Sequence, residues 1–118
     1  MAEDCIFCKI VKGKMKIEKI YENDNFMAFP DAHPIGEGHT LIIPKKHFET
    51  LMDLNKDISQ KCIFSIKEVT KILMKKHKAD GFNIVLNNGK SAGQVVKHVH
   101  FHLLPRKDGD KMRGIFIG

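Results

Sequence analysis

The chain has 118 residues, of which 42% are hydrophobic and 29% are charged, as is ordinary for a single soluble globular domain spanning residues 1–118. No apolar run approaches the roughly 20 residues that a membrane span requires, and no N-terminal segment has the pattern of a secretory signal. The net charge of +6 favours an anionic partner. No nucleic-acid-binding motif accompanies that charge and the chain has no Trp, which argues against nucleic acid as the partner.

The first part of the chain predicts one short helix and three strands. The helix is expected after Asp4, which can serve as its N-cap, and it ends at Gly13. Residues 16–21 and 26–29 have the composition of two short strands joined by a polar turn. The apolar run at residues 40–43 predicts a buried strand, which the following proline ends.

One long amphipathic helix is predicted between residues 57 and 77. Apolar residues recur there at intervals of three or four, which places them on one helical face. They are Ile58, Cys62, Ile66, Val69 and Leu73, and Ile63 and Ile72 are expected to widen that face. We expect His77, near the end of this helix, and His33, in an earlier loop, to lie on the surface.

Two further strands are predicted after the long helix, at residues 82–86 and 96–104. Consecutive strands with short turns and no strict βαβ alternation favour an antiparallel sheet. The predicted fold class is therefore α+β, with an antiparallel sheet of about five strands, one long helix and one short helix.

Three histidines alternate along the last predicted strand: His98, His100 and His102. Because side chains alternate between the faces of a strand, the three imidazoles are expected to share one face and to line a surface groove. This alternation has three interpretations: it arises by chance, the histidines share one metal site, or each histidine has a different role. His98 and His102 would lie about 13 Å apart at Cα, too far to share one metal ion, although neighbouring rings can do so. Divided roles assign one ring to a metal, one to nucleophilic attack and one to hydrogen bonding.

A polar, glycine-bearing loop at residues 87–93 precedes the histidines and favours the divided roles. Backbone N–H groups of such a loop can approach phosphate oxygens, and Asn87 and Gln94 add neutral donors. A neutral imidazole has a free lone pair at pH 7. A histidine that faces this loop is therefore suited to attack phosphorus and form a phosphoramidate that water hydrolyses.

Cys5 and Cys8 have the C-x-x-C spacing that suits two thiolates on one zinc ion. Two free or buried cysteines are the alternative, and a redox pair lacks the βαβ context that usually surrounds it. The odd number of cysteines, three, argues for a reducing compartment, the cytoplasm.

Several segments together resemble the histidine triad (HIT) superfamily. The run His-Val-His-Phe-His-Leu-Leu at residues 98–104 is similar to the family signature His-x-His-x-His-x-x, in which x is apolar. Residues 5–10, 38–47 and 92–97 also resemble family segments in their order and spacing, so the resemblance covers nearly the whole chain. The Cys pair resembles the bacterial-type branch of histidine triad nucleotide-binding proteins.

The resemblance implies a HIT-like fold, a homodimer and the binding of purine nucleoside monophosphates or their conjugates. It implies an adenosine phosphoramidase-like hydrolase that cleaves nucleoside phosphoramidates or related conjugates at the α-phosphate, through a nucleotidyl-histidine intermediate. A dinucleoside polyphosphate hydrolase is the first alternative, although Asn87 stands where that branch carries Gln. A nucleotide-binding regulatory protein with incidental activity is the second.

The resemblance also implies residue roles. His100 is the implied nucleophile, His102 the donor to the phosphate or the leaving group, and His39 a supporting catalytic residue. The implied substrate-binding residues are Phe7, Ile10, Asp31, Ala32, Leu41, Asn87, Gly93, Gln94, Val95, His100 and His102. Asp31 corresponds to the acidic residue that holds the ribose hydroxyls, whereas Val95 replaces the Ser or Thr of many members.

For the metal, the resemblance implies one structural zinc ion per chain, bound by Cys5, Cys8, His47 and His98. Such an ion would connect the N-terminal helix to the last strand without activating water.

Overall fold

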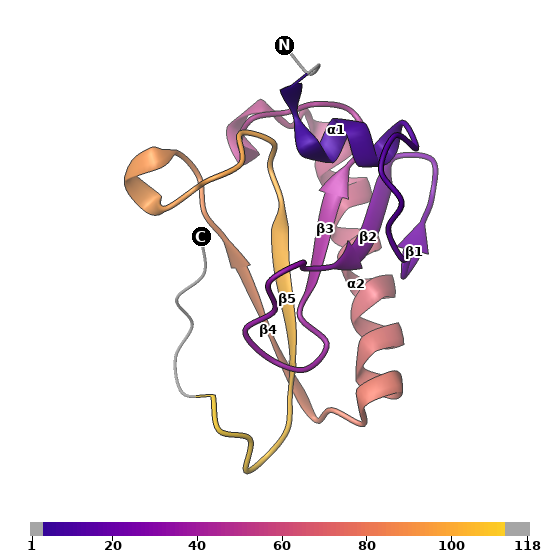
Figure 1. Ribbon diagram of the computed structural model, residues 1–118, viewed down its shortest axis with the longest axis vertical. Coiled ribbons are helices and arrows are strands. Elements are labelled where there is room, and N and C mark those ends of the chain that lie inside the picture. Colours follow the sequence, from indigo (N-terminus) through magenta and orange to yellow (C-terminus); the bar gives the residue numbers. More distant parts are fainter. Residues whose placement is uncertain (1–3, 113–118) are drawn as a thin grey trace.

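The fold, a computed structural model that describes residues 4–112, is built on one five-stranded antiparallel sheet. The strands are β1 (Tyr21–Glu22), β2 (Phe26–Pro30), β3 (Thr40–Pro44), β4 (Gly81–Leu86) and β5 (Phe101–Arg106). They lie in the order β1-β2-β3-β5-β4. Figure 1 shows the long helix α2 (Lys56–His77) behind the sheet and the short helix α1 (Ile6–Val11) in front of one end of it. The described residues also include the 3-10 turns η2 (Leu51–Asp53) and η3 (Lys90–Ala92). The predicted α+β class is confirmed.

The two faces of the sheet bury two separate apolar clusters, because side chains alternate along each strand. The cluster under α2 contains Phe26, Ala28, Ile42, Phe101 and Leu103 from the strands and Cys62, Ile66, Val69 and Leu73 from the helix. The cluster under α1 contains Met27, Phe29, Leu41 and Ile43 from the strands and Phe7 and Ile10 from the helix. Since Phe101 and Leu103 face α2, the intervening His102 faces the α1 side.

Helix α2 runs almost over the predicted range and begins where Asn55 accepts a hydrogen bond from the Ile58 N–H at 2.9 Å. The prediction that Ile63 and Ile72 widen its buried face is wrong, because 60% of Ile63 and 39% of Ile72 are exposed. Both residues lie at the flanks of the stripe, outside the width of the sheet that the helix covers.

The ends of three predicted elements differ from the structure. The N-cap of α1 is Cys5, whose sulfur accepts from the Cys8 N–H at 3.4 Å, and not Asp4. The strand expected at residues 16–21 is reduced to the two residues of β1. The last strand begins at Phe101, five residues later than expected, and continues through Pro105.

Strand β5 continues through Pro105, since this residue lies beyond the part of β5 that pairs with β3. The β3 pairing stops at Leu103, while β4 continues alongside and places Phe82 opposite Pro105. A proline there removes no ladder hydrogen bond to β3. Among residues 4–112, no helix combines the length and the apolar character needed to cross a membrane.

Truncation of the α2 stripe should cost stability only where the helix faces the sheet. Leu73 is 1% exposed within the α2 cluster, so Leu73→Ala should lower the free energy of unfolding by about 2–5 kcal/mol. Ile63→Ala, at a residue that is 60% exposed, should change it by less than about 1 kcal/mol. Urea unfolding of the two variants checks this, and equal losses would contradict the assigned helix orientation.

Candidate active site and metal centre

A pocket of about 460 Å³ opens on the α1 face of the sheet. Its walls come from α1, from the loop at residues 31–39 between β2 and β3, from β3 and from the segment around His100 and His102. Phe7, Ile10 and Leu41 form an apolar side, while the histidines form a polar side. The pocket therefore combines a surface for a flat apolar ring with groups that can do chemistry.

The pocket brings together most of the residues implied by the resemblance. They are Phe7, Ile10, Asp31, Ala32, His39, Leu41, Val95, His100 and His102. Asn87, Gly93 and Gln94 do not line it. The pocket also includes Met15, Ile17 and Ile35, which sequence reasoning missed because they lie in irregular segments without a periodic pattern.

The side chain of Gln94 forms hydrogen bonds that stabilise its own loop. Its Oε1 accepts from the Gly89 N–H at 2.7 Å, and its Nε2 donates to the carbonyls of Glu49 at 2.7 Å and Val96 at 3.0 Å. Both N–H groups of the amide are used within the protein, so the side chain is not the phosphate donor that the sequence predicted. The residue instead closes the loop between η3 and the histidines.

Some backbone N–H groups of the same loop are also unavailable to a ligand. The Gly93 N–H donates to the Lys90 carbonyl at 3.0 Å, so it too is used within the loop. The Val95 N–H makes no hydrogen bond with residues 4–112. Val95 is 78% exposed and borders the pocket. One backbone donor therefore remains at the pocket edge where many family members carry a hydroxyl.

The tautomer of His100 follows from its partner. Its Nδ1 lies 2.8 Å from the His98 carbonyl oxygen, which can only accept, so Nδ1 carries the proton. A neutral ring then has its lone pair on Nε2. The ring is 5% exposed, packs against Phe7 with ring centroids 5.1 Å apart, and lines the pocket. The expected surface groove is thus a buried pocket wall, and the ring is suited to nucleophilic attack within it.

A second chain of hydrogen bonds fixes the tautomer of His102. The Ile35 N–H donates to Nδ1 of His39 at 3.2 Å, so a neutral His39 carries its proton on Nε2. That Nε2 lies 3.0 Å from Nδ1 of His102 and donates to it. A neutral His102 therefore carries its own proton on Nε2, as a hydrogen-bond donor. His100 and a neutral His102 therefore have opposite tautomers, with the proton on Nδ1 in one ring and on Nε2 in the other.

Asp31 lies at the polar end of this chain. Its Oδ1 accepts from the His33 N–H at 2.8 Å, and its Oδ2 lies 3.4 Å from His39 Nε2 and 3.9 Å from His102 Nδ1. Burial lowers the pKa of His39 below its usual range, although the Asp31 charge opposes this shift. His39 is therefore neutral at pH 7, as its donor and acceptor pattern requires.

Cys5, Cys8, His47 and His98 form a cluster whose ligand atoms all lie within 4.8 Å of one another. Cys5 Sγ is 3.3 Å from His98 Nδ1, and Cys8 Sγ is 3.3 Å from His47 Nδ1 and 3.5 Å from His98 Nδ1. A tetrahedral zinc ion with ordinary bond lengths separates its sulfur and nitrogen ligands by about 3.6 Å. The geometry and the donor set of this cluster therefore fit zinc.

The surroundings of His98 support the same fit. Its Nε2 donates to the Pro44 carbonyl at 2.8 Å, which leaves the Nδ1 lone pair directed at the cysteines. Burial lowers the pKa of His98 to about 4, so the ring is neutral at pH 7. Burial also raises the pKa of Cys8 to about 11. A cation is thus what would make this buried thiol a thiolate.

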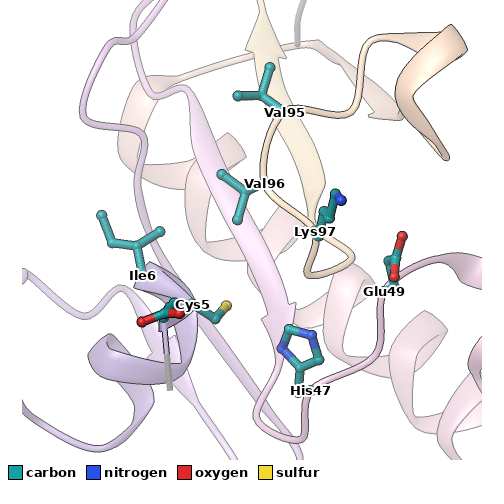
Figure 2. Close-up of a pocket in the computed structure, with 8 residues that line it drawn as sticks. Cys5, Ile6, His47, Glu49, Val95, Val96 and Lys97 are labelled. Carbon is teal, nitrogen blue, oxygen red and sulfur yellow. The ribbon is translucent and has the colours of Figure 1, made fainter. Parts of the chain in front are cut away.

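A second cavity of about 460 Å³ lies beside the metal cluster. Figure 2 shows the sulfur of Cys5 and the ring of His47 pointing toward each other, with Val96 and Lys97 on the neighbouring segment. Ile6, Val95 and Val96 line this cavity and the histidine pocket alike. The cysteine–histidine cluster and the histidine pocket therefore lie on either side of one short segment.

Comparison with known proteins gives a consistent result. The family model described as HIT domain matches residues 12–109. An uncharacterised HIT-like protein of Methanocaldococcus jannaschii is 46% identical over 106 residues, which cover 90% of this chain and 81% of that protein. The adenosine 5'-monophosphoramidase HNT1 of Candida albicans is 43% identical over 118 residues, which cover 97% of this chain and 76% of that protein.

Solved structures agree with this result. The crystal structure of a HIT family member from Bacillus subtilis superposes with a TM-score of 0.88 at 33% identity, covering 98% of this chain and 83% of that one. The likeness therefore extends over the sheet and both helices.

Disruption of the cysteine–histidine cluster should remove the metal. We expect about one zinc ion per chain in protein purified without added metal, and Cys8→Ser should lower both the zinc content and the melting temperature, since a structural zinc site contributes folding free energy. Cys62→Ala changes the cysteine that lies outside the cluster and should retain the zinc. Elemental analysis measures the content, and metal-free wild-type protein with reactive Cys5 and Cys8 would contradict the assignment.

Proposed function

Because this chain belongs to the HIT domain family, we propose that it is a nucleotide hydrolase that releases a purine nucleoside monophosphate from a phosphoramidate or related conjugate. The single observation that supports this best is the His100 ring, whose Nδ1 proton is held by a carbonyl while its Nε2 has a lone pair inside a pocket. The phosphoramidase name of the Candida albicans relative supports the same substrate class.

The chemistry proposed for the pocket has two steps. In the first, the His100 Nε2 lone pair attacks the α-phosphorus, the bond from phosphorus to the leaving amine breaks, and the amine takes a proton from solvent, which regains one when water attacks in the second step. His102, with its proton on Nε2, hydrogen-bonds the phosphate or that leaving group. In the second, water attacks the nucleotidyl-histidine, the phosphorus–nitrogen bond to His100 breaks, and the nucleoside monophosphate leaves. Fixed donors aimed at the developing phosphate charge lower both barriers.

The rest of the pocket is assigned to substrate binding. Phe7, Ile10 and Leu41 provide the apolar side against which the purine packs, next to Ala32. Asp31 binds the ribose hydroxyls as an acceptor. The Val95 N–H replaces the hydroxyl donor of other members at the phosphate. Gly93 and Gln94 shape the loop that holds this N–H, and Asn87 has no place in the pocket lining.

A zinc ion bound by Cys5, Cys8, His47 and His98 is proposed as structural. Four protein ligands leave no open position for water, and the cluster connects α1 to the segment that carries His100. The three free cysteines suit a reducing compartment, so we propose the cytoplasm as the location.

We propose a homodimer that forms through the β4 edge. Within residues 4–112, β4 pairs only with β5, so its other edge is open. Ile84 lies opposite Leu103 in the ladder and therefore shares its α2 face. Ile84 and Phe82 are each 46% exposed, so this edge presents an apolar patch. A second copy would cover this patch and pair the edge.

Removal of the proposed nucleophile should abolish turnover and leave the fold intact. His100→Ala should lower the rate of adenosine 5'-phosphoramidate hydrolysis by about a thousandfold or more, because no other group forms the covalent intermediate. The variant should keep its zinc content and far-UV circular dichroism. A wild-type rate in this variant would overturn the assignment.

The same preparation separates the substrate classes. We expect the ratio kcat/KM to be higher for adenosine 5'-phosphoramidate than for a dinucleoside polyphosphate. The opposite order would favour polyphosphate hydrolysis, and tight nucleotide binding without turnover of either would favour a regulatory role.

A charge on the β4 edge should dissociate the dimer. Ile84→Glu places a carboxylate in the proposed interface, so the variant should sediment as a monomer, at 13.5 kDa, where the wild type sediments as a dimer. Ile72→Glu is the matched control, since the neighbouring helix residues Ser65 and Lys76 contact Asn23 and Glu18 on the far, β1 side. A monomeric wild type would contradict the proposal.

A further inference from the structure

The loop at residues 31–39 contributes more residues to the pocket lining than any single helix or strand. It contributes Asp31, Ala32, His33, Ile35 and His39 to the lining. Its conformation is stabilised from inside by short-range bonds, such as the Ile35 N–H to His39 Nδ1 and the His39 N–H to the Gly36 carbonyl at 3.2 Å. These bonds fix the loop relative to itself, while the His39 ring, 3.0 Å from His102 Nδ1, connects its inner side to β5.

The far side of this loop is held by the end of α2. His77, the last residue of α2, has its Nδ1 2.8 Å from Glu37 Oε2, and Lys107 Nζ lies 3.5 Å from the same oxygen. The His77 side chain is 16% exposed, so the prediction that it lies free on the surface is wrong. The sequence hides this contact because the two residues are 40 positions apart.

The backbone next to Glu37 packs directly on the same ring. Gly38 has a φ of +78°, and a Cβ there would lie 2.8 Å from two ring atoms of His77 and 2.7 Å from Cγ of Pro105. Only a glycine fits such an approach. The peptide that precedes His39 therefore lies against the His77 ring.

A cavity of about 290 Å³ lies behind the loop, between it and the end of α2. Asp31, His39, Leu73 and His77 are among the residues that line it. The loop is consequently not backed by a fully packed core on this side. Across this cavity His77 contacts Glu37 and Gly38, next to Pro105 and Lys107, which approach the same two residues.

We propose that His77 is a positioning residue of the nucleotide site, which acts through Glu37 and Gly38 to hold Asp31 and His39 in place. This inference rests on the proposed function, since the loop borders the proposed nucleotide pocket. His77 touches no reacting atom. Its effect passes to the ribose through Asp31 and to the tautomer of His102 through His39.

The test compares His77→Ala with two reference variants. His77→Ala should weaken AMP binding and raise KM for adenosine 5'-phosphoramidate, each on the order of tenfold, because misplacement of a binding loop is costly. His77→Gln keeps an N–H donor for Glu37 and should recover most of this loss. Lys75→Ala, an exposed residue of the same helical turn, should match the wild type.

A double-mutant cycle shows whether the two residues act as one unit. If the contact carries the effect, Glu37→Ala combined with His77→Ala should lose little more AMP affinity than His77→Ala alone. Fully additive losses would overturn the proposal.

Hydrogen exchange of the Ile35 and His39 amides separates a local effect from a loss of the whole fold. Both amides should exchange faster in His77→Ala, while amides in the middle of α2 keep their wild-type rates. Unchanged amide exchange together with unchanged AMP affinity would overturn the proposal. AMP binding and amide exchange require no turnover, so they test the positioning role even if the wild-type protein does not hydrolyse phosphoramidates. That result would contradict only the proposed activity.

Discussion

The hydrogen bond from His100 Nδ1 to the His98 carbonyl is the interaction on which the rest of the site depends. His98 serves both centres at once: its ring Nδ1 faces the cysteines, its Nε2 donates to Pro44, and its carbonyl fixes the tautomer of His100. A carbonyl cannot donate, so the lone pair of a neutral His100 ring is confined to Nε2, on the other side of the ring. Distortion of the cysteine–histidine cluster would therefore disturb the carbonyl that accepts the His100 Nδ1 proton.

Burial of so many imidazoles demands a partner for each polar atom that no solvent reaches. Side chains of His39, His98, His100 and His102 are all nearly inaccessible, and no buried side-chain nitrogen or oxygen in the described part of the chain lacks a hydrogen bond. An unpaired polar group in such a place would cost more than the net value of a typical hydrogen bond. These bonds also fix the tautomers of His39, His98 and His100, each through its own partner.

Hydrophobic periodicity predicted the buried side of an element correctly where a single clear pattern packs against a single surface. The apolar stripe of α2 and the alternation of His100 with Phe101 and His102 both follow from the burial of apolar side chains between the helix and the sheet. Element ends were less well predicted, since the segment before β5 is held by a bond from the Val99 N–H to the Phe48 carbonyl at 2.7 Å and not by a ladder. The role of Gln94 was missed for a similar reason: an amide suits a phosphate and a loop equally well, and only its neighbours decide between them.

By itself, the sequence determined the fold class and the alternation of His100 with Phe101 and His102, and the family resemblance pointed to a Cys-x-x-C paired with distant histidines. Those features depend on spacing along the chain and on the fixed periods of helices and strands. Only the tertiary structure decided the tautomers, the closure of Gln94 on its own loop and the contact of His77 with the loop before β3. Each of these depends on which group from a remote segment arrives within about 3 Å, and hydrogen bonds at that range are set by packing in three dimensions and not by local pattern.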